Sequence, residues 1–144
     1  MPPPIPPLLL VDDDEADIFL LQRALQKANL TLPEHIVTDG EEAIDYLSGR
    51  GPFADRNAFP IPHAIFLDLK MPFVSGFEVL EWIRTQPQLA SIPVFVLTGS
   101  SIERDRQRAF ELGARHYLTK PATPALLVEL LCPRDLQAAP AANQ

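Results

Sequence analysis

The sequence predicts an α/β fold in which five parallel strands alternate with five helices, a (βα)5 doubly wound sheet. Short and nearly continuous apolar runs alternate with longer segments whose apolar residues recur near helical spacing. Continuous apolar runs are typical of parallel strands, because a parallel sheet is buried on both faces. Strict alternation also requires crossover connections, which place helices on both sides of the sheet. The expected strand order is 2-1-3-4-5, one of the two common orders of doubly wound sheets.

Each predicted strand is a short apolar run followed by a polar residue, and each leads into a predicted helix. The strands are expected at residues 8–11, 35–37, 64–67, 94–97 and 116–118. The helices are expected at residues 15–28, 41–48, 77–85, 102–112 and 124–131. In the first helix Ile18, Leu21 and Leu25 follow helical spacing, and Asp14 is expected to cap its start.

The last two helices differ in their apolar content. The fourth has few apolar anchors (Ile102, Ala109 and Phe110) among charged residues, so we expect it to be loosely held and mobile. The fifth contains the apolar run 125–131, which must cover the sheet and also favours association with another protein.

Composition and charge argue against several classes of function. With 144 residues, 16.0 kDa and 47% hydrophobic residues, the chain is expected to form one domain. A net charge of -7 and a pI near 4.8 argue against nucleic-acid binding, which requires clustered Lys and Arg. The single cysteine, Cys132, allows no intrachain disulfide and favours a reducing compartment, the cytoplasm. The sequence contains no run of about 18 apolar residues, so no membrane span is predicted.

The distribution of proline sets the expected limits of the domain. Residues 1–7 are a Pro-rich lead, expected to be extended and poorly ordered because successive prolines fix φ and remove backbone donors. The folded domain is expected at residues 8–131, and residues 132–144 are expected to form a C-terminal arm or tail.

Polar side chains follow the predicted strands at their carboxyl ends, where doubly wound sheets bind ligands. Asp12 and Asp13 follow the first strand, Asp68 the third, Thr98 the fourth and Lys120 the fifth. One interpretation is that acids after a strand only cap the next helix. If the first and third strands are neighbours, however, three carboxylates converge. Like charges about 4 Å apart repel by roughly 4 kcal/mol per pair at an effective dielectric of about 20.

Converging carboxylates require either raised pKa values or a bound cation. Oxygen ligands without His or Cys suit Mg²⁺, which we therefore expect as the cofactor. Such a site suits the formation of an aspartyl phosphate on Asp68, with Lys120 and the Thr98 hydroxyl contacting the phosphoryl oxygens. Taken singly, Lys120 also fits a surface lysine and Thr98 a β-branched residue that ends a strand.

Four motifs that contain these residues resemble the receiver domain family of two-component signalling. They are LLLVDDDE at 8–15, FLDLKMPFVSGFE at 66–78, VLTGS at 96–100 and HYLTKP at 116–121. The resemblance implies a flavodoxin-like receiver fold over residues 8–131. It also implies a single-domain response regulator that accepts a phosphoryl group from a histidine kinase and signals by changing conformation. Such a protein catalyses only its own phosphorylation and dephosphorylation.

The resemblance assigns roles to the acidic residues and to one backbone group. Asp68 would be the phosphoacceptor, Asp13 a direct metal ligand, and Asp12 a second acid that acts through metal-bound water. The backbone carbonyl of Lys70 would supply another metal ligand. Lys70 and Ser100 also stand two residues beyond the acceptor and the threonine, at positions that vary in receivers and tune dephosphorylation.

Further roles follow from the same resemblance. Thr98 and Lys120 would contact the phosphoryl group, and Tyr117 would act with Thr98 as a switch whose ring turns inward on activation. Pro121 would follow a cis peptide bond, which X-Pro bonds adopt at low cost. Gly76 would occupy a position that needs an unusual φ before the third helix.

The segment YLSGRGPFADRNAFPIPH at 46–63 is longer than the usual connection between a helix and a strand. It is similar to the extension found in stand-alone receivers that partner phytochrome-type histidine kinases. The alternative interpretation is an ordinary surface insertion.

Three other functions compete with the receiver. A phosphatase of the haloacid dehalogenase class also forms an aspartyl phosphate, but it needs an acid two residues after the nucleophile, where this chain has Lys70. A flavodoxin-like flavin carrier would meet repulsion from the aspartates after the first strand. A degenerate receiver scaffold is disfavoured because the acids, Thr98 and Lys120 are all present.

The signal is expected to be passed on through a partner or homodimer interface formed by helix 4, strand 5, helix 5 and the C-terminal arm.

Overall fold

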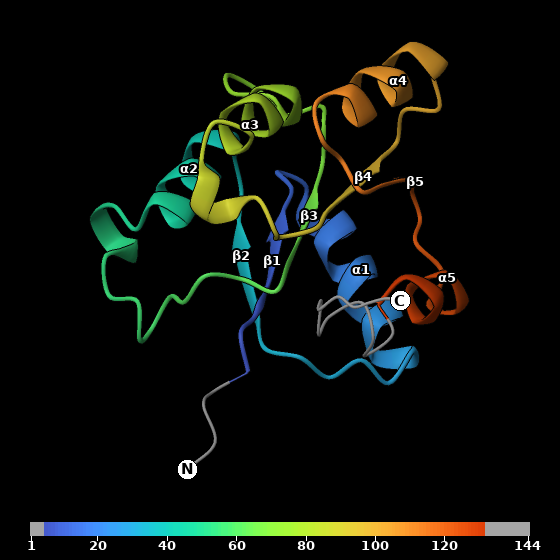
Figure 1. Cartoon of the computed structure of the whole chain (residues 1–144). Coiled ribbons are helices and arrows are strands. Elements are labelled where there is room, and N and C mark those ends of the chain that lie inside the picture. The colour runs from blue at the N-terminus through green and yellow to red at the C-terminus, as the bar shows by residue number, and fades with distance from the viewer. Residues whose placement is uncertain (1–4, 132–144) are drawn as a thin grey trace.

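The computed structural model describes residues 5–131, so the C-terminal arm at 132–144 and most of the lead at 1–7 lie outside the described residues. At the edge of that lead, Pro7 is buried and its carbonyl accepts a hydrogen bond from the His63 backbone at 2.8 Å. The described chain forms a five-stranded parallel sheet in the order β2-β1-β3-β4-β5, with helices between the strands (Figure 1). The predicted α/β architecture and strand order are confirmed.

The elements alternate along the chain as predicted. The strands are β1 Leu8–Val11, β2 Glu34–Val37, β3 Ala64–Leu67, β4 Val94–Thr98 and β5 His116–Thr119. The α-helices are α1 Glu15–Lys27, α2 Gly40–Ser48, α3 Gly76–Ile83, α4 Glu103–Glu111 and α5 Pro124–Leu130, and short 3-10 helices lie at Gly51–Phe53 and Pro87–Leu89. Half of these bounds equal the predicted ones, and the other half differ by one or two residues. At helix starts, capping residues rather than apolar residues fix the first turn. Asp14 caps α1 as expected, accepting hydrogen bonds from Ala16 and Asp17, and Ser75 caps α3.

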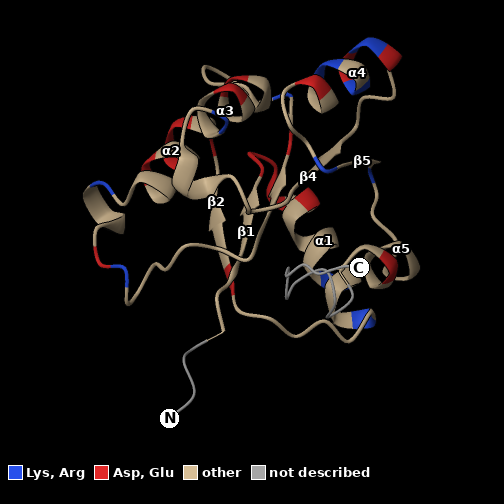
Figure 2. Ribbon diagram, in the orientation of Figure 1, with Lys and Arg blue, Asp and Glu red and all other residues tan. Residues whose placement is uncertain are grey.

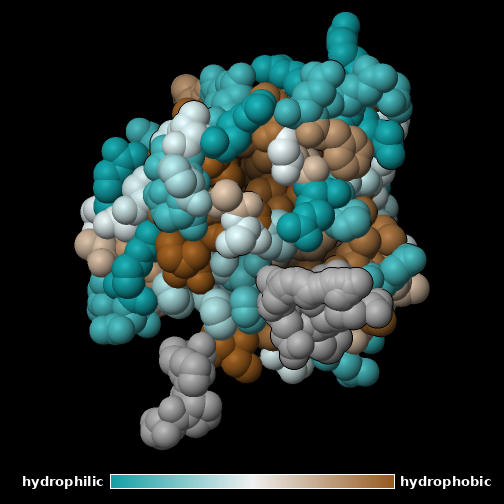
Figure 3. Space-filling model, viewed as in Figure 1, coloured by the Kyte–Doolittle hydropathy of each residue, from teal (hydrophilic) through white to brown (hydrophobic). Residues whose placement is uncertain are grey.

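Side chains of the buried strands divide into two cores, one on each face of the sheet. Leu8 and Leu10 of β1 pack with α1 and α5, whereas Leu9 and Val11 pack with α2, α3 and α4 (Figure 1). All four side chains are buried, as expected for a strand covered on both faces. On the outer surface, mainly hydrophilic side chains cover α4, and hydrophobic atoms show chiefly between the helices (Figure 3). Among residues 5–131, no helix has the length and apolar character needed to cross a membrane.

The segment after α2 folds around one arginine side chain. The Arg56 guanidinium donates hydrogen bonds to the carbonyl oxygens of Tyr46 at 2.8 Å, Leu47 at 2.8 Å and Phe59 at 3.0 Å. The rings of Phe53 and Phe59 pack edge to face, with centroids 5.2 Å apart. Arg56 therefore joins the end of α2 to the loop that leads into β3.

Replacing Arg56 with Ala should lower the free energy of unfolding by about 2 kcal/mol, because three carbonyl groups lose a charged donor. Arg50→Ala is the matched control, since Arg50 makes only an exposed ion pair with Asp45 at 3.4 Å. Urea unfolding of both variants checks the prediction. Equal stability of the two variants would show that the loop does not depend on Arg56.

Two glycines hold the loop between β3 and α3 in place. An added Cβ would clash with the backbone carbonyl of Asp68 at Gly76 and with that of Val74 at Gly40. The expected unusual φ at Gly76 is therefore wrong, because Gly76 is the first residue of α3 and close approach of backbones is what excludes a side chain. Between these contacts, Phe73 has a φ of 67° and a side chain that is 99% exposed. That left-handed conformation costs an ordinary residue about 1–2 kcal/mol.

Candidate functional site

Three carboxylates meet where β1 and β3 end. Val11 and Leu67 are register partners at the ends of the two strands, so the following Asp12 and Asp68 are neighbours. Oxygen atoms of Asp12, Asp13 and Asp68 all lie within 4.8 Å of one another. Figure 2 shows acidic segments of the chain at the upper ends of β1 and β3, close to the acidic start of α1. The predicted convergence of three carboxylates is confirmed.

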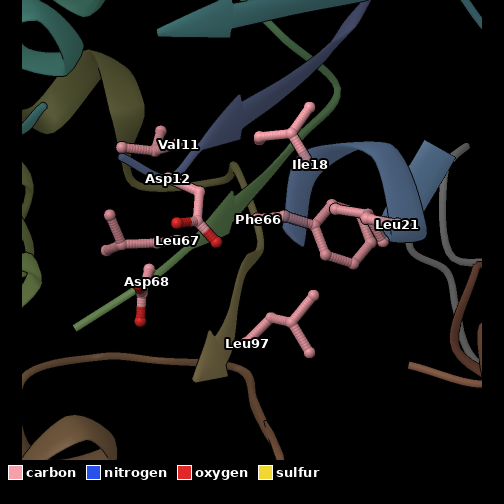
Figure 4. A pocket seen from close by; sticks show the side chains of 8 residues that line it. All are labelled: Val11, Asp12, Ile18, Leu21, Phe66, Leu67, Asp68 and Leu97. Carbon is pink, nitrogen blue, oxygen red and sulfur yellow. The ribbon is translucent and has the colours of Figure 1, made fainter. Parts of the chain in front are cut away.

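The acids differ in their exposure to solvent. Asp12 and Asp68 are each only 6% exposed, whereas Asp13 is exposed. Figure 4 shows the carboxylates of Asp12 and Asp68 beside a small pocket whose wall carries Ile18 and Leu97, together with other apolar side chains. Apolar walls limit the solvent screening of charge, so interactions at these two carboxylates are stronger than at the surface.

Lys120, at the end of β5, neutralises part of this negative charge. Its ammonium lies 2.8 Å from a carboxylate oxygen of Asp12, 2.6 Å from Asp17 and 3.3 Å from Asp68. Burial opposes the charged form, but the hydrogen bonds to Asp12 and Asp17 and the charge of Asp68 outweigh it and raise the pKa of Lys120 well above its usual range. Three neighbouring carboxylates therefore share one ammonium, and the exposed Asp13 adds a further negative charge to the cluster, so the site keeps an excess of negative charge.

Asp17 was missing from the residues predicted for the site. It lies in the first turn of α1, where an acidic side chain is also explained by its favourable interaction with the helix dipole. Its place in the first turn of α1, directly after the strand-end acids, is the signal that relates it to them. Only the structure shows that it shares Lys120 with them.

The Asp12→Asn variant should be more stable than the wild-type chain by about 1 kcal/mol at neutral pH in chelator, because it removes one of the excess buried charges. Burial raises the pKa of the Asp12 carboxyl above 3.8, even with the hydrogen bond from Lys120. Its charged form is therefore disfavoured in the folded chain, and the cost grows as the pH rises from 3.8 through the raised pKa.

Urea unfolding from acid to neutral pH checks this prediction. The two chains should become equally stable below pH 3.8, where the carboxyl is protonated in the folded and unfolded states. Added Mg²⁺ should reverse their order, because a metal that binds the wild-type acids stabilises only the folded chain. A variant that is less stable in chelator at neutral pH would contradict the prediction.

Thr98 and Tyr117 lie on the neighbouring strands. Thr98 is fully buried as the last residue of β4, and the backbone of Ser100 donates to its hydroxyl at 3.4 Å. The half-buried Tyr117 donates its hydroxyl to the Ser100 carbonyl at 2.9 Å, and burial raises the pKa of that hydroxyl. The loop after Thr98 therefore connects the two predicted switch residues. The Lys120–Pro121 peptide bond that follows is cis.

Lys70 reaches away from the acids towards α4. Its backbone N–H donates to the Asp68 carboxylate at 3.4 Å, while its ammonium pairs with Asp105 at 3.1 Å. The Ser100 hydroxyl donates to the same Asp105 carboxylate at 2.7 Å. Asp105 was not predicted, because in the sequence it is one of several charged residues on a helix with few apolar anchors.

Comparison with protein families identifies the domain that carries this site. The family model of the response regulator receiver domain matches residues 8–132. The response regulator Rcp1 of Synechocystis sp. is 39% identical over 113 residues, covering 78% of this chain and 75% of that protein. A solved Mn²⁺-bound form of Rcp1 aligns with a TM-score of 0.77 and 32% identity over 96% of this chain and 99% of that chain.

Two further solved structures belong to response regulators of phytochromes. The bacteriophytochrome response regulator AtBRR aligns with a TM-score of 0.81 and 34% identity, over 99% of each chain. The phosphorylated cyanobacterial phytochrome response regulator RcpA aligns with a TM-score of 0.75 and 36% identity, over 88% of each chain. The match with AtBRR covers nearly the whole chain and therefore includes the segment after α2.

Proposed function

Because the chain belongs to the response-regulator receiver family, we propose that it accepts a phosphoryl group on Asp68 from a histidine kinase and signals by changing conformation. The observation that carries this proposal is the buried Asp68 carboxylate at the end of β3, in one cluster with Asp12 and 3.3 Å from the Lys120 ammonium. Incubation of the chain with acetyl phosphate and Mg²⁺, followed by intact mass measurement, tests it. The mass should rise by one phosphoryl group, and an unchanged mass would contradict the proposal.

In the proposed reaction, a carboxylate oxygen of Asp68 attacks the phosphorus of a phosphohistidine. An O–P bond forms, the P–N bond breaks, and its electron pair stays on the imidazole nitrogen of the kinase. Lys120 holds a positive charge beside the attacking carboxylate, and Thr98 offers a hydroxyl at the adjacent strand end. Lys70 stands two residues beyond Asp68, so the chain lacks at that position the acid that a haloacid dehalogenase phosphatase uses for turnover.

The acidic cluster fits a divalent metal, which we take to be Mg²⁺. Its donors are carboxylate oxygens of Asp12, Asp13 and Asp68, to which the proposal adds the backbone carbonyl of Lys70. A site made only of oxygen donors, one of them from the exposed Asp13, suits a cation that keeps several bound waters and also binds phosphate oxygens. When bound, Mg²⁺ would neutralise the negative charge that builds up on the transferring phosphoryl group.

We assign the switch to Thr98 and Tyr117. A phosphoryl group on Asp68 adds a charge of about -1.5 to -2 and three acceptor oxygens, which attract the Thr98 hydroxyl and Lys120. Thr98 is joined through Ser100 to the Tyr117 hydroxyl, so a shift at the end of β4 reaches β5 directly. The ring of Tyr117 already packs against the core formed with α2, α3 and α4.

We further propose that the kinase is of the phytochrome type and that the two proteins meet in the cytoplasm. Support comes from the likeness to AtBRR, RcpA and Rcp1, which cover 99%, 88% and 96% of this chain. Phosphotransfer from a phytochrome-type kinase should be much faster than from an unrelated histidine kinase at equal concentration. Equal transfer rates would contradict the assignment of this partner.

The proposed output surface is the face formed by α4, β5 and α5, through which the chain would form a homodimer or bind a partner. Exposed apolar side chains on this face include Ile102 at 54%, Phe110 at 38% and Val128 at 48%. Amide hydrogen exchange with and without phosphorylation tests the surface. Changes confined to the neighbourhood of Asp68, with none across residues 102–131, would rule it out.

A further inference from the structure

One carboxylate of α4 bridges the two loops that border the acceptor site. The Asp105 side chain is 12% exposed and binds the Lys70 ammonium at 3.1 Å and the Ser100 hydroxyl at 2.7 Å, both through the same oxygen. Lys70 comes from the loop after β3 and Ser100 from the loop after β4. The bridge therefore ties α4 to the loops that follow β3 and β4.

We propose that Asp105 is a positioning residue that retains the Lys70 ammonium on α4 until a phosphoryl group on Asp68 draws it away. The inference rests on the proposed phosphorylation of Asp68. It adds a competition between two anions, the carboxylate of α4 and the phosphoryl group, for one ammonium.

Lys70 is within reach of both anions. Its backbone N–H lies 3.4 Å from the Asp68 carboxylate, so its side chain starts next to the acceptor, and 58% of that side chain is exposed, with the ammonium 5.9 Å from the centre of the Phe77 ring. A long lysine side chain on such a pivot can turn from α4 towards the site. The phosphoryl group carries about -1.5 to -2 charges against the single charge of Asp105, so it is the stronger attractor.

Asp105 remains a charged competitor in the unphosphorylated chain. The hydrogen bond from Ser100, followed by that from Lys70, holds the pKa of Asp105 below its ordinary value, so the carboxylate is ionised at neutral pH. Loss of Lys70 would leave this poorly exposed charge with only the Ser100 hydroxyl as a direct donor. Phosphorylation would thus weaken the attachment of α4 at its first turn.

The attachment matters because α4 has few others. Only Asp105 and Ala109 are buried among the residues of α4, while Ile102 and Phe110 are largely exposed. Removing one of the two Asp105 contacts therefore loosens the end of α4 that lies next to the site. This links the charge on Asp68 to a helix of the proposed output surface.

Binding of beryllofluoride, a phosphoryl mimic, with Mg²⁺ tests the competition in four chains: wild type, Asp105→Asn, Lys70→Met and the double variant. Asp105→Asn should bind the mimic about two- to fivefold more tightly, because Lys70 no longer has to leave an ion pair. In the Lys70→Met background, the same change should have less than about a twofold effect. Asp105→Glu should restore binding to near the wild-type level.

Glu103→Gln is the charge control, because it removes an acid from the same helix that pairs with Arg106 instead of Lys70. It should change the affinity for the mimic much less than Asp105→Asn does. Amide exchange without the mimic gives a second readout: Asp105→Asn and Lys70→Met should both speed exchange in residues 100–106.

The outcomes separate this inference from the function on which it rests. An equal effect of Asp105→Asn with and without Lys70, or an equal effect of Glu103→Gln, would overturn the competition and leave Asp68 as the acceptor. Unchanged exchange at residues 100–106 in both variants would overturn the bridge. A wild-type chain that binds no mimic would overturn the proposed function and the competition together.

Discussion

The Asp68→Asn variant should gain no phosphoryl group under conditions that label the wild-type chain fully. A neutral amide is no nucleophile for phosphorus, so the loss should be complete and not partial. The fold should remain intact, because Asn has nearly the same shape and removes one charge from a cluster with an excess of acids. The strand that places Asp68 is held by backbone pairing with β1 and β4, which the change does not touch.

Intact mass after incubation with acetyl phosphate and Mg²⁺ measures the loss, and circular dichroism verifies the fold. Asp45→Asn is the matched control, since Asp45 lies on α2 and pairs only with the exposed Arg50. The control should be labelled like the wild-type chain. A full mass gain in Asp68→Asn would place the acceptor on another residue.

The Lys120→Met variant should lose about 3 kcal/mol of unfolding free energy in chelator, because it leaves buried carboxylates without their ammonium. Lys120 contacts Asp12, Asp17 and Asp68, and only 17% of its side chain is exposed. Its raised pKa keeps Lys120 charged at neutral pH, so these pairs are fully present there in the wild type.

Mg²⁺ should restore a larger part of the stability in Lys120→Met than it adds to the wild type. In the variant the metal is the only cation left for the carboxylates, whereas in the wild type it shares them with an ammonium. Urea unfolding with and without Mg²⁺ measures both effects. Lys27→Met, at the exposed last turn of α1, is the control and should respond like the wild type. Equal stability of Lys120→Met and this control in chelator would contradict the assigned role.

The fold and the acidic cluster were predictable because both follow from topology. Buried parallel strands leave long apolar runs in the sequence, and their order brings the residues after β1 and β3 together. The sequence alone therefore predicts that Asp12, Asp13 and Asp68 form one group. The same reasoning placed Thr98 and Lys120 at the ends of the neighbouring strands.

Contacts made from helices could not be predicted in the same way. Periodicity shows which side of a helix faces the core, but it does not show which partner a charged side chain meets. From the sequence, Asp17 and Asp105 are both expected to face solvent on a helix. In the structure Asp17 binds Lys120, and Asp105 binds Lys70. The reason for Gly76 was also hidden, since a clash with the Asp68 carbonyl depends on how closely two backbones approach.

The glycine contacts around the loop between β3 and α3 hold its backbone in place. The surface that the loop presents to another protein can therefore change without a change in the reaction centre. Gly40 and Gly76 fix the two sides of the loop, so whichever side chain occupies position 73 is displayed at a constant place near the acceptor. A substitution of the fully exposed Phe73 alters what an approaching protein meets and leaves the backbone of Asp68 where it is. We therefore expect a change of the side chain at position 73 to alter recognition by the proposed kinase more than it alters the chemistry at Asp68.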